Sequence, residues 1–413
     1  MMEHTKEQIR AVYGKTVSRL KEKHIGCFAG MDKPLLLISD TYPGVWLEHV
    51  YDSVLLAKME PAYLPLAVNT ISLFIDHQTA DGQLPCYVWN RDKIDCPEEE
   101  LIGYSQIQEC VSFAHLCVEV CRMADDRALW ETCYAAAKKW DSWLRKNRMT
   151  THRGLIEQFV GYDTGHDNSG RLAGLSCPGN YRKDGVYQNA AVLPPDDPAA
   201  PILAVDMNCN FYATQLALAE MADILGLPEE VAQWRANAAA VKGALFDRCF
   251  DAADAFFYDV DKHGEKRRYR ACTVFHLFLE GVLDPAADAA LIETIHRRYL
   301  ADPTEFATPY PYPSMSVSDP SWKKHAPANC WGYFSQGLIA LRCTRWMDDY
   351  GWGDELDRLC AIWADNWTKY FDILPMGQEL DPITGVPSES SRWYSSTMLF
   401  YIYAVRRLGL LTE

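Results

Sequence analysis

The loop "GYDTGHDNSGR" (residues 161–171) gathers side chains that can do acid–base chemistry. It contains Asp163, Asp167 and Arg171, and glycines interrupt the run on both sides of the carboxylates. Because glycine disfavours regular structure, we expect an irregular loop. Two carboxylates beside a guanidinium suit catalysis in a cleft. The same residue types also build ordinary Asx turns, and for a single loop the turn is the commoner case.

A second acidic loop, "GQELDPITG" (residues 377–385), carries Glu379 and Asp381. Two well-separated acidic loops are typical of glycoside hydrolysis, in which a carboxylic acid protonates the leaving oxygen and a carboxylate activates water on the opposite face of the sugar. A partly desolvated loop position raises the pKa of one carboxyl toward the working pH. The pattern therefore favours a glycosidase.

Aromatic residues cluster at the expected junctions between loops and helices. Flat rings pack against the apolar faces of sugars, although most of the 13 tryptophans are expected in the core. The junction residues taken as sugar-contacting candidates are Trp331, Trp393 and Tyr394.

Other chemistries lack their signatures. No spacing of His and Cys suits zinc, no glycine-rich motif suits a nucleotide, and no GxSxG motif suits a serine hydrolase. His166, inside the first loop, is interpreted as a pocket-wall residue. We expect no metal and no cofactor. The net charge of −16 argues against a nucleic-acid partner, because phosphate contacts need a basic face.

The elements that must position these loops are mostly helical, since apolar residues recur at spacings of three and four. Gly226 marks a helix end and Pro228 begins the next helix. A β-hairpin is expected over 256–270. Helices are predicted over 5–23, 47–59, 61–78, 105–124, 127–147, 205–226, 228–248, 270–281, 286–299, 330–350, 353–371 and 391–408.

Twelve helices without a strand-rich half predict six helical hairpins closed into a ring, an all-α (α/α)6 barrel. The alternative, an α-solenoid, should show self-similar repeats, and none is visible. The long irregular segments 79–104, 148–204, 300–329 and 372–390 are expected to form the funnel of an active site.

We expect residues 1–413 to form one catalytic domain, since the composition, 48% hydrophobic and 23% charged, is ordinary for a globular protein. The first residues do not resemble a signal peptide, and no stretch approaches the roughly 20 apolar residues of a membrane helix. The 14 cysteines show no CxxC pairing, and Cys117 and Cys121 suit burial. Reduced thiols of this kind predict a cytoplasmic protein without a membrane partner.

The segment "TGHDNSGR" (164–171) resembles the "SGxDNSxR" signature of glycoside hydrolase family 63 and the mannosylglycerate-hydrolase-like enzymes, of which trehalases carry a related version. Further blocks follow in the family order, and the resemblance spans roughly residues 40 to 410. They include "HVYDSVLLA" (49–57), "QTADGQLP" (78–85), "AVDMNCNFY" (204–212) and "SRWYSSTMLFYI" (391–402).

This resemblance implies an (α/α)6 barrel that hydrolyses α-glycosides with inversion. It implies that Asp167 is the general acid and that Arg171 holds carboxylates or sugar hydroxyls through its planar fork. Asp52 and Gln106 match sugar-contacting positions, and Asp163 takes the place of a glutamate in the motif, where it positions Asp167 or the sugar.

The general base is expected at Glu379. The family usually has its glutamate four residues before the proline, whereas here Gln378 holds that position and Glu379 lies three residues before Pro382. Glu389 and Asp381 are the alternatives.

The expected substrate is a small α-linked carbohydrate, either a disaccharide or a glycosyl-glycerate. Lys323, Lys324 and Arg392 are candidate contacts for an acidic aglycone, and a solvated lysine pair is the commoner reading of the first two. A sugar epimerase or polysaccharide lyase on a helical barrel, and a non-catalytic sugar-binding relative, remain alternatives. The sugar, the aglycone and the oligomeric state are left open.

Overall fold

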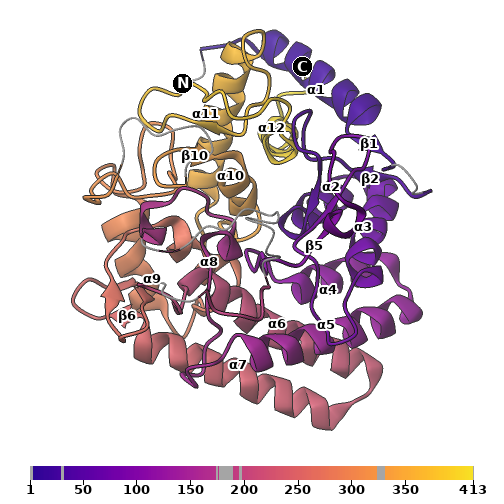
Figure 1. The fold of residues 1–413 in the computed structure, drawn as a ribbon. Coiled ribbons are helices and arrows are strands. Elements are labelled where there is room, and N and C mark those ends of the chain that lie inside the picture. The colour runs from indigo at the N-terminus through magenta and orange to yellow at the C-terminus, as the bar shows by residue number, and fades with distance from the viewer. Residues whose placement is uncertain are drawn as a thin grey trace.

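Twelve α-helices form two concentric rings in the computed structural model, which describes residues 3–28, 32–173, 175, 189–194, 198–322 and 331–412 (Figure 1). The inner ring consists of α2 (Val50–Met59), α4 (Phe113–Ala124), α6 (Val205–Leu225), α8 (Phe275–Leu279), α10 (Gly337–Cys343) and α12 (Ser395–Arg407). The outer ring consists of α1 (Lys6–Lys23), α3 (Leu64–Asp76), α5 (Arg127–Asn147), α7 (Pro228–Arg248), α9 (Ala289–Ile295) and α11 (Gly353–Tyr370). This is the expected (α/α)6 barrel.

The difference between the rings follows from the residues of each helix. Helix α6 buries side chains all around its axis, whereas its outer partner α7 buries a single stripe. A helix that is apolar on all sides belongs inside a protein, and a helix with one apolar stripe covers its surface. The stripe of α7 is Val231, Ala238, Val241 and Leu245.

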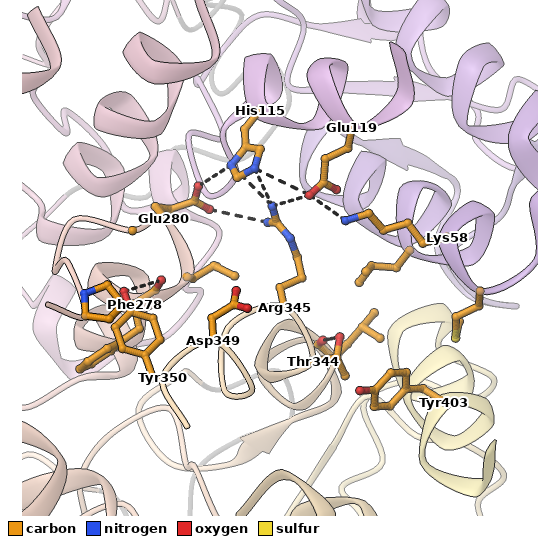
Figure 2. A pocket seen from close by; sticks show the side chains of 16 residues that line it. Lys58, His115, Glu119, Phe278, Glu280, Thr344, Arg345, Asp349, Tyr350 and Tyr403 are labelled. Carbon is orange, nitrogen blue, oxygen red and sulfur yellow. Dashed lines mark hydrogen bonds and ion pairs between the residues drawn. The ribbon is translucent and has the colours of Figure 1, made fainter. Parts of the chain in front are cut away.

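The inner helices run in the same direction, so the barrel has two distinct mouths. At one mouth the helices begin: Asp52 in the first turn of α2 contacts Ser395, the first residue of α12. At the other mouth they end: Lys58 near the end of α2 pairs with Glu119 of α4, which also pairs with Arg345 just after α10 (Figure 2). We call these the N-terminal and the C-terminal mouth.

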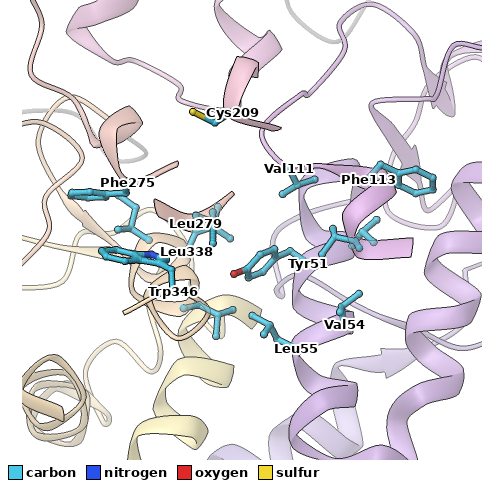
Figure 3. Close-up of a cluster of buried hydrophobic side chains, with 14 of the residues drawn as sticks. Tyr51, Val54, Leu55, Val111, Phe113, Cys209, Phe275, Leu279, Leu338 and Trp346 are labelled. Carbon is cyan, nitrogen blue, oxygen red and sulfur yellow. The ribbon is translucent and has the colours of Figure 1, made fainter. Parts of the chain in front are cut away.

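The centre of the barrel is apolar. Tyr51 and Leu55 of α2, Phe275 of α8, Leu338 of α10 and Trp346 point toward one another from opposite sides of the ring (Figure 3). Stacking of Phe278 of α8 on Trp346, with ring centroids 5.4 Å apart, helps to close the ring between α8 and α10.

The strands are short and support the loops. They are β1 (Ile25–Gly26) with β2 (Leu35–Leu36), β3 (Gly44–Trp46) with β4 (Tyr87–Trp89) and β5 (Ile102–Gly103), β6 (Phe250–Asp251) with β7 (Phe256–Phe257), β8 (Asp259–Val260) with β9 (Lys266–Arg267), and β10 (Ser335–Gln336) with β11 (Glu379–Leu380); all pairs are antiparallel. The hairpin expected over 256–270 is present as β8 and β9.

Several predicted helix boundaries were wrong. The helix predicted over 105–124 begins only at Phe113, because Ser112 caps it and because Asp163 accepts a hydrogen bond from the backbone of Ile107. The helix predicted over 330–350 is reduced to α10. There, a Cβ added to Gly337 would lie 2.0 Å from Oγ1 of Thr397, so this glycine allows α12 to approach the start of α10.

Other predicted helices also start later or end earlier than expected. The helices over 47–59 and 61–78 begin as 3₁₀ turns, η1 (Leu47–His49) and η2 (Pro61–Tyr63), and the last begins at Ser395 instead of 391. The helices over 270–281 and 286–299 shorten to α8 and α9, and α9 continues as a π-helix over His296–Leu300.

In the described ranges no helix is long and apolar enough to cross a membrane. The cysteines placed by the structure are free, and Cys117 and Cys121 are buried in the core, as expected from their spacing.

Candidate active site

The loop that carries Asp167 is anchored from inside by Asp163. The carboxylate of Asp163 is fully buried and pairs with both Nη atoms of Arg148, at 2.6 and 3.1 Å. It also accepts hydrogen bonds from the backbone N–H groups of Ile107, Phe159 and Val160, at 3.0, 2.9 and 3.1 Å. Every lone-pair direction of this carboxylate is thus occupied by protein. Asp163 holds three segments together beneath the loop.

The turn after Asp163 brings the loop close to the start of α2. Gly165 has a φ of +69°, which favours glycine, and a Cβ there would lie 3.1 Å from Oε2 of Glu48 and 3.3 Å from Sγ of Cys110. Asn168 also adopts a positive φ, +59°, a conformation that asparagine tolerates better than most residues. Asp167 therefore sits between two tight backbone positions.

Arg171 closes the loop by binding two carboxylates. Its Nη1 lies 2.6 Å from Oδ2 of Asp259, and its Nη2 lies 2.6 Å from Oδ2 of Asp206. Burial opposes its charge, but these carboxylates outweigh that effect and raise the pKa of Arg171. Arg171 was expected to hold either carboxylates or sugar hydroxyls, and in the structure it binds the carboxylates of Asp206 and Asp259.

The ring of His166 links Arg171 to Trp331. Nη2 of Arg171 donates to Nδ1 of His166 at 3.1 Å, so the ring nitrogen that faces the arginine is an acceptor. Burial and Arg171 lower the pKa of His166 well below its usual range, and the ring is neutral. Trp331 stacks on it with centroids 4.3 Å apart, and its backbone N–H donates to the carbonyl of Asp167 at 2.9 Å. This stack fixes the backbone of Asp167.

Glu379 belongs to the ladder β10–β11, directly opposite Gln336. It is fully buried, and its Oε2 accepts from Nε2 of Gln336 at 2.5 Å while its Oε1 accepts from Oγ of Ser388 at 2.7 Å. The alternatives to Glu379 are placed differently. Asp381 caps its own turn through the N–H groups of residues 383 and 384, and Glu389 is exposed.

Tyr42 brings the two acidic loops into one electrostatic environment. Its hydroxyl donates to Oε1 of Gln378 at 3.0 Å. Burial raises the pKa of Tyr42, and the negative charges of Asp167, Glu379 and Glu48 raise it further. The charges of three carboxylates from distant parts of the chain thus act on one phenol at the N-terminal mouth.

Glu48 is the third carboxylate of this group. Its Oε1 accepts from Nη2 of Arg342 at 2.8 Å, and both side chains are nearly buried. Burial raises the pKa of Glu48 to about 7; Arg342 opposes this shift, whereas Asp167 and Asp52 add to it. Tyr51 packs under Arg342, whose guanidinium carbon lies 5.7 Å from the ring centroid.

Asp52 ties the starts of α2 and α12 together. It accepts hydrogen bonds from Oγ of Ser395 at 2.5 Å and Oγ of Ser396 at 2.9 Å. Burial raises the pKa of Asp52 to about 6, although the two hydroxyls work in the opposite direction. Tyr394, the residue before α12, lies beside this pair, and its hydroxyl is 3.0 Å from Nε2 of His49. Burial lowers the pKa of His49 to about 3, so this ring is neutral.

Two expected site residues differ in their placement. Gln106 is buried in the loop held by Asp163, and its Oε1 has no hydrogen-bond partner among the described residues. Trp393 is not brought to this group: it packs on the outer side of α12, with Arg19 of α1 5.2 Å above its ring and Phe371 at 5.5 Å. Lys323 and Lys324 lie outside the described residues, and Arg392 is exposed.

Sequence reasoning missed Tyr42, Glu48, His49 and Arg342. The first three lie in the stretch "YPGVWLEHVYD" (42–52), and their nearness in sequence to Asp52 was the signal that could have found them. The signal for Arg342 was a single charge in the apolar run "GLIALRC" of α10. A buried charge is rarely unpaired, so such a residue predicts a partner.

The fold and the carboxylates at one mouth of the helical barrel are those expected of a glycosidase. Residues 56–335 match the family model of the mannosylglycerate hydrolase MGH1-like glycoside hydrolase domain, and the chain belongs to this glycoside hydrolase family.

Solved structures show the same fold. The GH63 mannosylglycerate hydrolase from Thermus thermophilus in complex with Tris aligns with a TM-score of 0.72 and 16% identity, covering 96% of this chain and 99% of that chain. Its complex with glucose aligns with a TM-score of 0.69 and 16% identity, covering 95% and 99%. Neutral trehalase from Saccharomyces cerevisiae aligns with a TM-score of 0.64 and 14% identity, covering 91% and 74%.

Proposed function

We propose that the protein is an inverting hydrolase of a small α-linked glycoside, with Asp167 as general acid and Glu379 as general base. The observation that carries the proposal is the segment 331–336, which joins the two acidic loops: the N–H of Trp331 donates to the carbonyl of Asp167, and the side chain of Gln336 donates to the carboxylate of Glu379. Inversion needs two such carboxyls on opposite sides of the scissile bond.

Asp167 donates its proton to the glycosidic oxygen as the bond to the anomeric carbon breaks. Its half-buried side chain stands on a backbone held by Trp331 and by the Asp163 anchor, so the carboxyl keeps its direction. Nearby Glu48 supports this role. Glu48 places a second acidic group beside Asp167, and Arg342 balances the charge of Glu48.

Glu379 takes a proton from the water that attacks the anomeric carbon from the opposite face. Hydrogen bonds from Gln336 and Ser388 orient its carboxylate and favour the ionised form, which a base requires. The products are the aglycone alcohol and a free sugar of inverted anomeric configuration. The acid recovers its proton, and the base loses its own, by exchange with solvent.

Substrate contacts are proposed for Asp52, Gln106, Trp331 and Tyr394. Asp52 and Tyr394 lie near Tyr42 and Glu48 at the same mouth. Oε1 of Gln106 has no hydrogen-bond partner among the described residues, and a sugar hydroxyl can donate to it. Asp163 and Arg171 are proposed as positioning residues, because their charged atoms are occupied by protein partners.

The substrate class proposed is a disaccharide or a glycosyl-glycerate. The solved relative from Thermus thermophilus is a mannosylglycerate hydrolase, and one of its structures is a complex with Tris and D-glycerate. We extend the proposal to residues 1–413 as one catalytic domain, since a continuous apolar core runs from Ile9 to Leu410.

The test is release of free monosaccharide from α-glucosyl-glycerate, α-mannosyl-glycerate, sucrose, trehalose and kojibiose. Asp167→Asn and Glu379→Gln should each lose about 10²-fold or more in kcat. Asp372→Asn, at an exposed site, is the control.

Two further readouts separate the roles. Nuclear magnetic resonance of the first sugar released should show the β-anomer. Azide should restore turnover to Glu379→Ala, with a β-glycosyl azide as the product, but it should not restore turnover to Asp167→Ala. Release of the α-anomer would contradict inversion. If azide rescues Glu389→Ala and not Glu379→Ala, Glu389 is the general base. An unsaturated product that absorbs in the ultraviolet would indicate a lyase.

A further inference from the structure

A cavity opens at the C-terminal mouth, at the end of the barrel away from Asp167 and Glu379. Its volume is about 640 Å³, within the range of small-molecule sites. It lies where α2, α8 and α10 end, and α4 and α12 also line it (Figure 2). None of the residues placed near Tyr42 lines it.

The floor of this cavity is a network of charged side chains centred on Arg345. Its Nη2 lies 2.9 Å from Oε1 of Glu119 and 3.1 Å from Nε2 of His115. On the other side of the imidazole ring, Nδ1 of His115 lies 3.2 Å from Oε2 of Glu280. The imidazole of His115 thus lies between the guanidinium of Arg345 and the carboxylate of Glu280.

Two carboxylate oxygens of the network lack a close donor. Oε2 of Glu119 is buried and has no hydrogen-bond partner among the described residues, and Oε1 of Glu280 lies 4.0 Å from Nη1 of Arg345, beyond hydrogen-bond distance. At the rim, Asp349 is exposed and forms no ion pair within the described ranges. Lys58 stands opposite, with its Nζ 2.8 Å from Glu119 and its side chain 41% exposed.

The walls are apolar and aromatic. Tyr350 and Tyr403 stand on opposite sides of the opening (Figure 2). The hydroxyl of Tyr350 donates to the carbonyl of Leu283 at 2.6 Å, which fixes the ring. The remaining apolar lining residues are Leu55, Met59, Phe278, Leu279, Pro285 and Leu341.

The charges nearly cancel. Lys58 and Arg345 supply two positive charges against the three carboxylates of Glu119, Glu280 and Asp349. An anion would meet the carboxylates, and a multivalent cation would meet the lysine and arginine. In the described residues no group of His, Cys, Asp and Glu has the arrangement of a metal site. Donors and acceptors side by side, flanked by flat rings, suit hydroxyl groups on a compact carbon skeleton.

We propose that the cavity at the C-terminal mouth binds a neutral polyhydroxylated molecule, a monosaccharide or a polyol, at a site separate from the N-terminal mouth. Its hydroxyls donate to Glu280 and Asp349 and accept from Lys58, while its apolar face lies on Tyr350 or Tyr403.

The test is calorimetric titration of the whole chain with D-glucose, D-mannose and D-mannitol, with D-glycerate and spermidine as charged probes. The pocket variant is Lys58→Ala with Asp349→Ala. Its matched control is Lys139→Ala with Asp372→Ala, which removes the same two charge types from exposed positions. The variant Met59→Trp fills the cavity without altering a charge.

A neutral probe should bind the wild type and the control alike. Its affinity at this site should fall about tenfold or more in the pocket variant and in Met59→Trp, as expected for the loss of one or two hydrogen bonds or of the space. Binding of a probe at the N-terminal mouth is distinguished from binding in this cavity, because neither the pocket variant nor Met59→Trp changes a residue of the N-terminal mouth. Equal binding by all variants, binding of spermidine or D-glycerate alone, or binding of no probe would overturn the proposal. Thermal unfolding verifies that the variants are folded.

Discussion

Gln336 and Glu379 face each other across the β10–β11 ladder, with Nε2 of the amide 2.5 Å from Oε2 of the carboxylate. The ladder fixes both backbones, so the amide is aimed at the carboxylate before any substrate arrives. A neutral donor in this position favours the ionised carboxylate without adding a charge to the site.

The first prediction is that Gln336→Glu impairs the proposed base. A second carboxylate at this distance forces the pair to share a proton, so the acidic limb of the pH–rate profile should move to higher pH. We expect kcat to fall about tenfold or more at the wild-type optimum. Gln233→Glu, the same change at an exposed position, is the control. A profile with an unmoved acidic limb would show that Glu379 does not accept the proton.

Much of the fold was predictable because local signals and tertiary packing agree. The end of α6 at Gly226 and the start of α7 at Pro228 follow from backbone preferences that need no tertiary contact. The helix wrongly predicted over residues 105–112 has the opposite cause. That segment has helical spacing, but its backbone is drawn to Asp163 of a distant loop, and tertiary contacts override spacing.

The site was only partly predictable for a related reason. Motif order indicated Asp167, Asp52 and Glu379, but not which way each side chain turns. Nothing in the sequence pairs Glu48 with Arg342, which are 294 residues apart. The sequence also shows no reason why Trp393 should turn to α1 while its neighbour Tyr394 turns to His49.

The second prediction concerns the anchor beneath the loop that carries Asp167. Arg148→Met leaves the carboxylate of Asp163 buried without its counter-charge, and breaking a buried pair in this way costs about 3–5 kcal/mol of unfolding free energy. Chemical denaturation measures it. Arg268→Met is the control, because its pair with Asp251 is solvent-exposed on the arginine side, and exposed pairs contribute little to stability. Equal losses in the two variants would show that the anchor does not stabilise the fold.

The third prediction is a pH dependence of stability from Glu48. Its pKa rises from 4.5 to about 7 in the folded chain, chiefly through burial. The folded state therefore retains a proton that the unfolded state loses as pH rises between these values. The contribution of Glu48 to stability should decline over that window, by on the order of 3 kcal/mol, and stay constant above it.

Glu48→Gln should abolish this slope. It should also lower stability by a pH-independent amount, because Arg342 is left buried without its partner. The measurement is the unfolding free energy of both proteins from pH 4.5 to pH 7.5, with Glu60→Gln as a partly exposed control. If the difference between wild type and Glu48→Gln is the same at every pH, Glu48 is ionised throughout this range.

The fourth prediction separates two adjacent aromatic residues. Tyr394 faces Tyr42 and His49 at the N-terminal mouth, whereas the ring of Trp393 packs between Arg19 and Phe371. Tyr394→Ala should raise KM about tenfold or more, because the ring beside the proposed sugar site is lost. Trp393→Ala should lower the midpoint of thermal unfolding and leave KM within about twofold. Tyr394→Phe keeps the ring and isolates the contribution of the hydroxyl near His49. An increase of KM in Trp393→Ala that matches the increase in Tyr394→Ala would mean that Trp393 turns toward the substrate in the working enzyme.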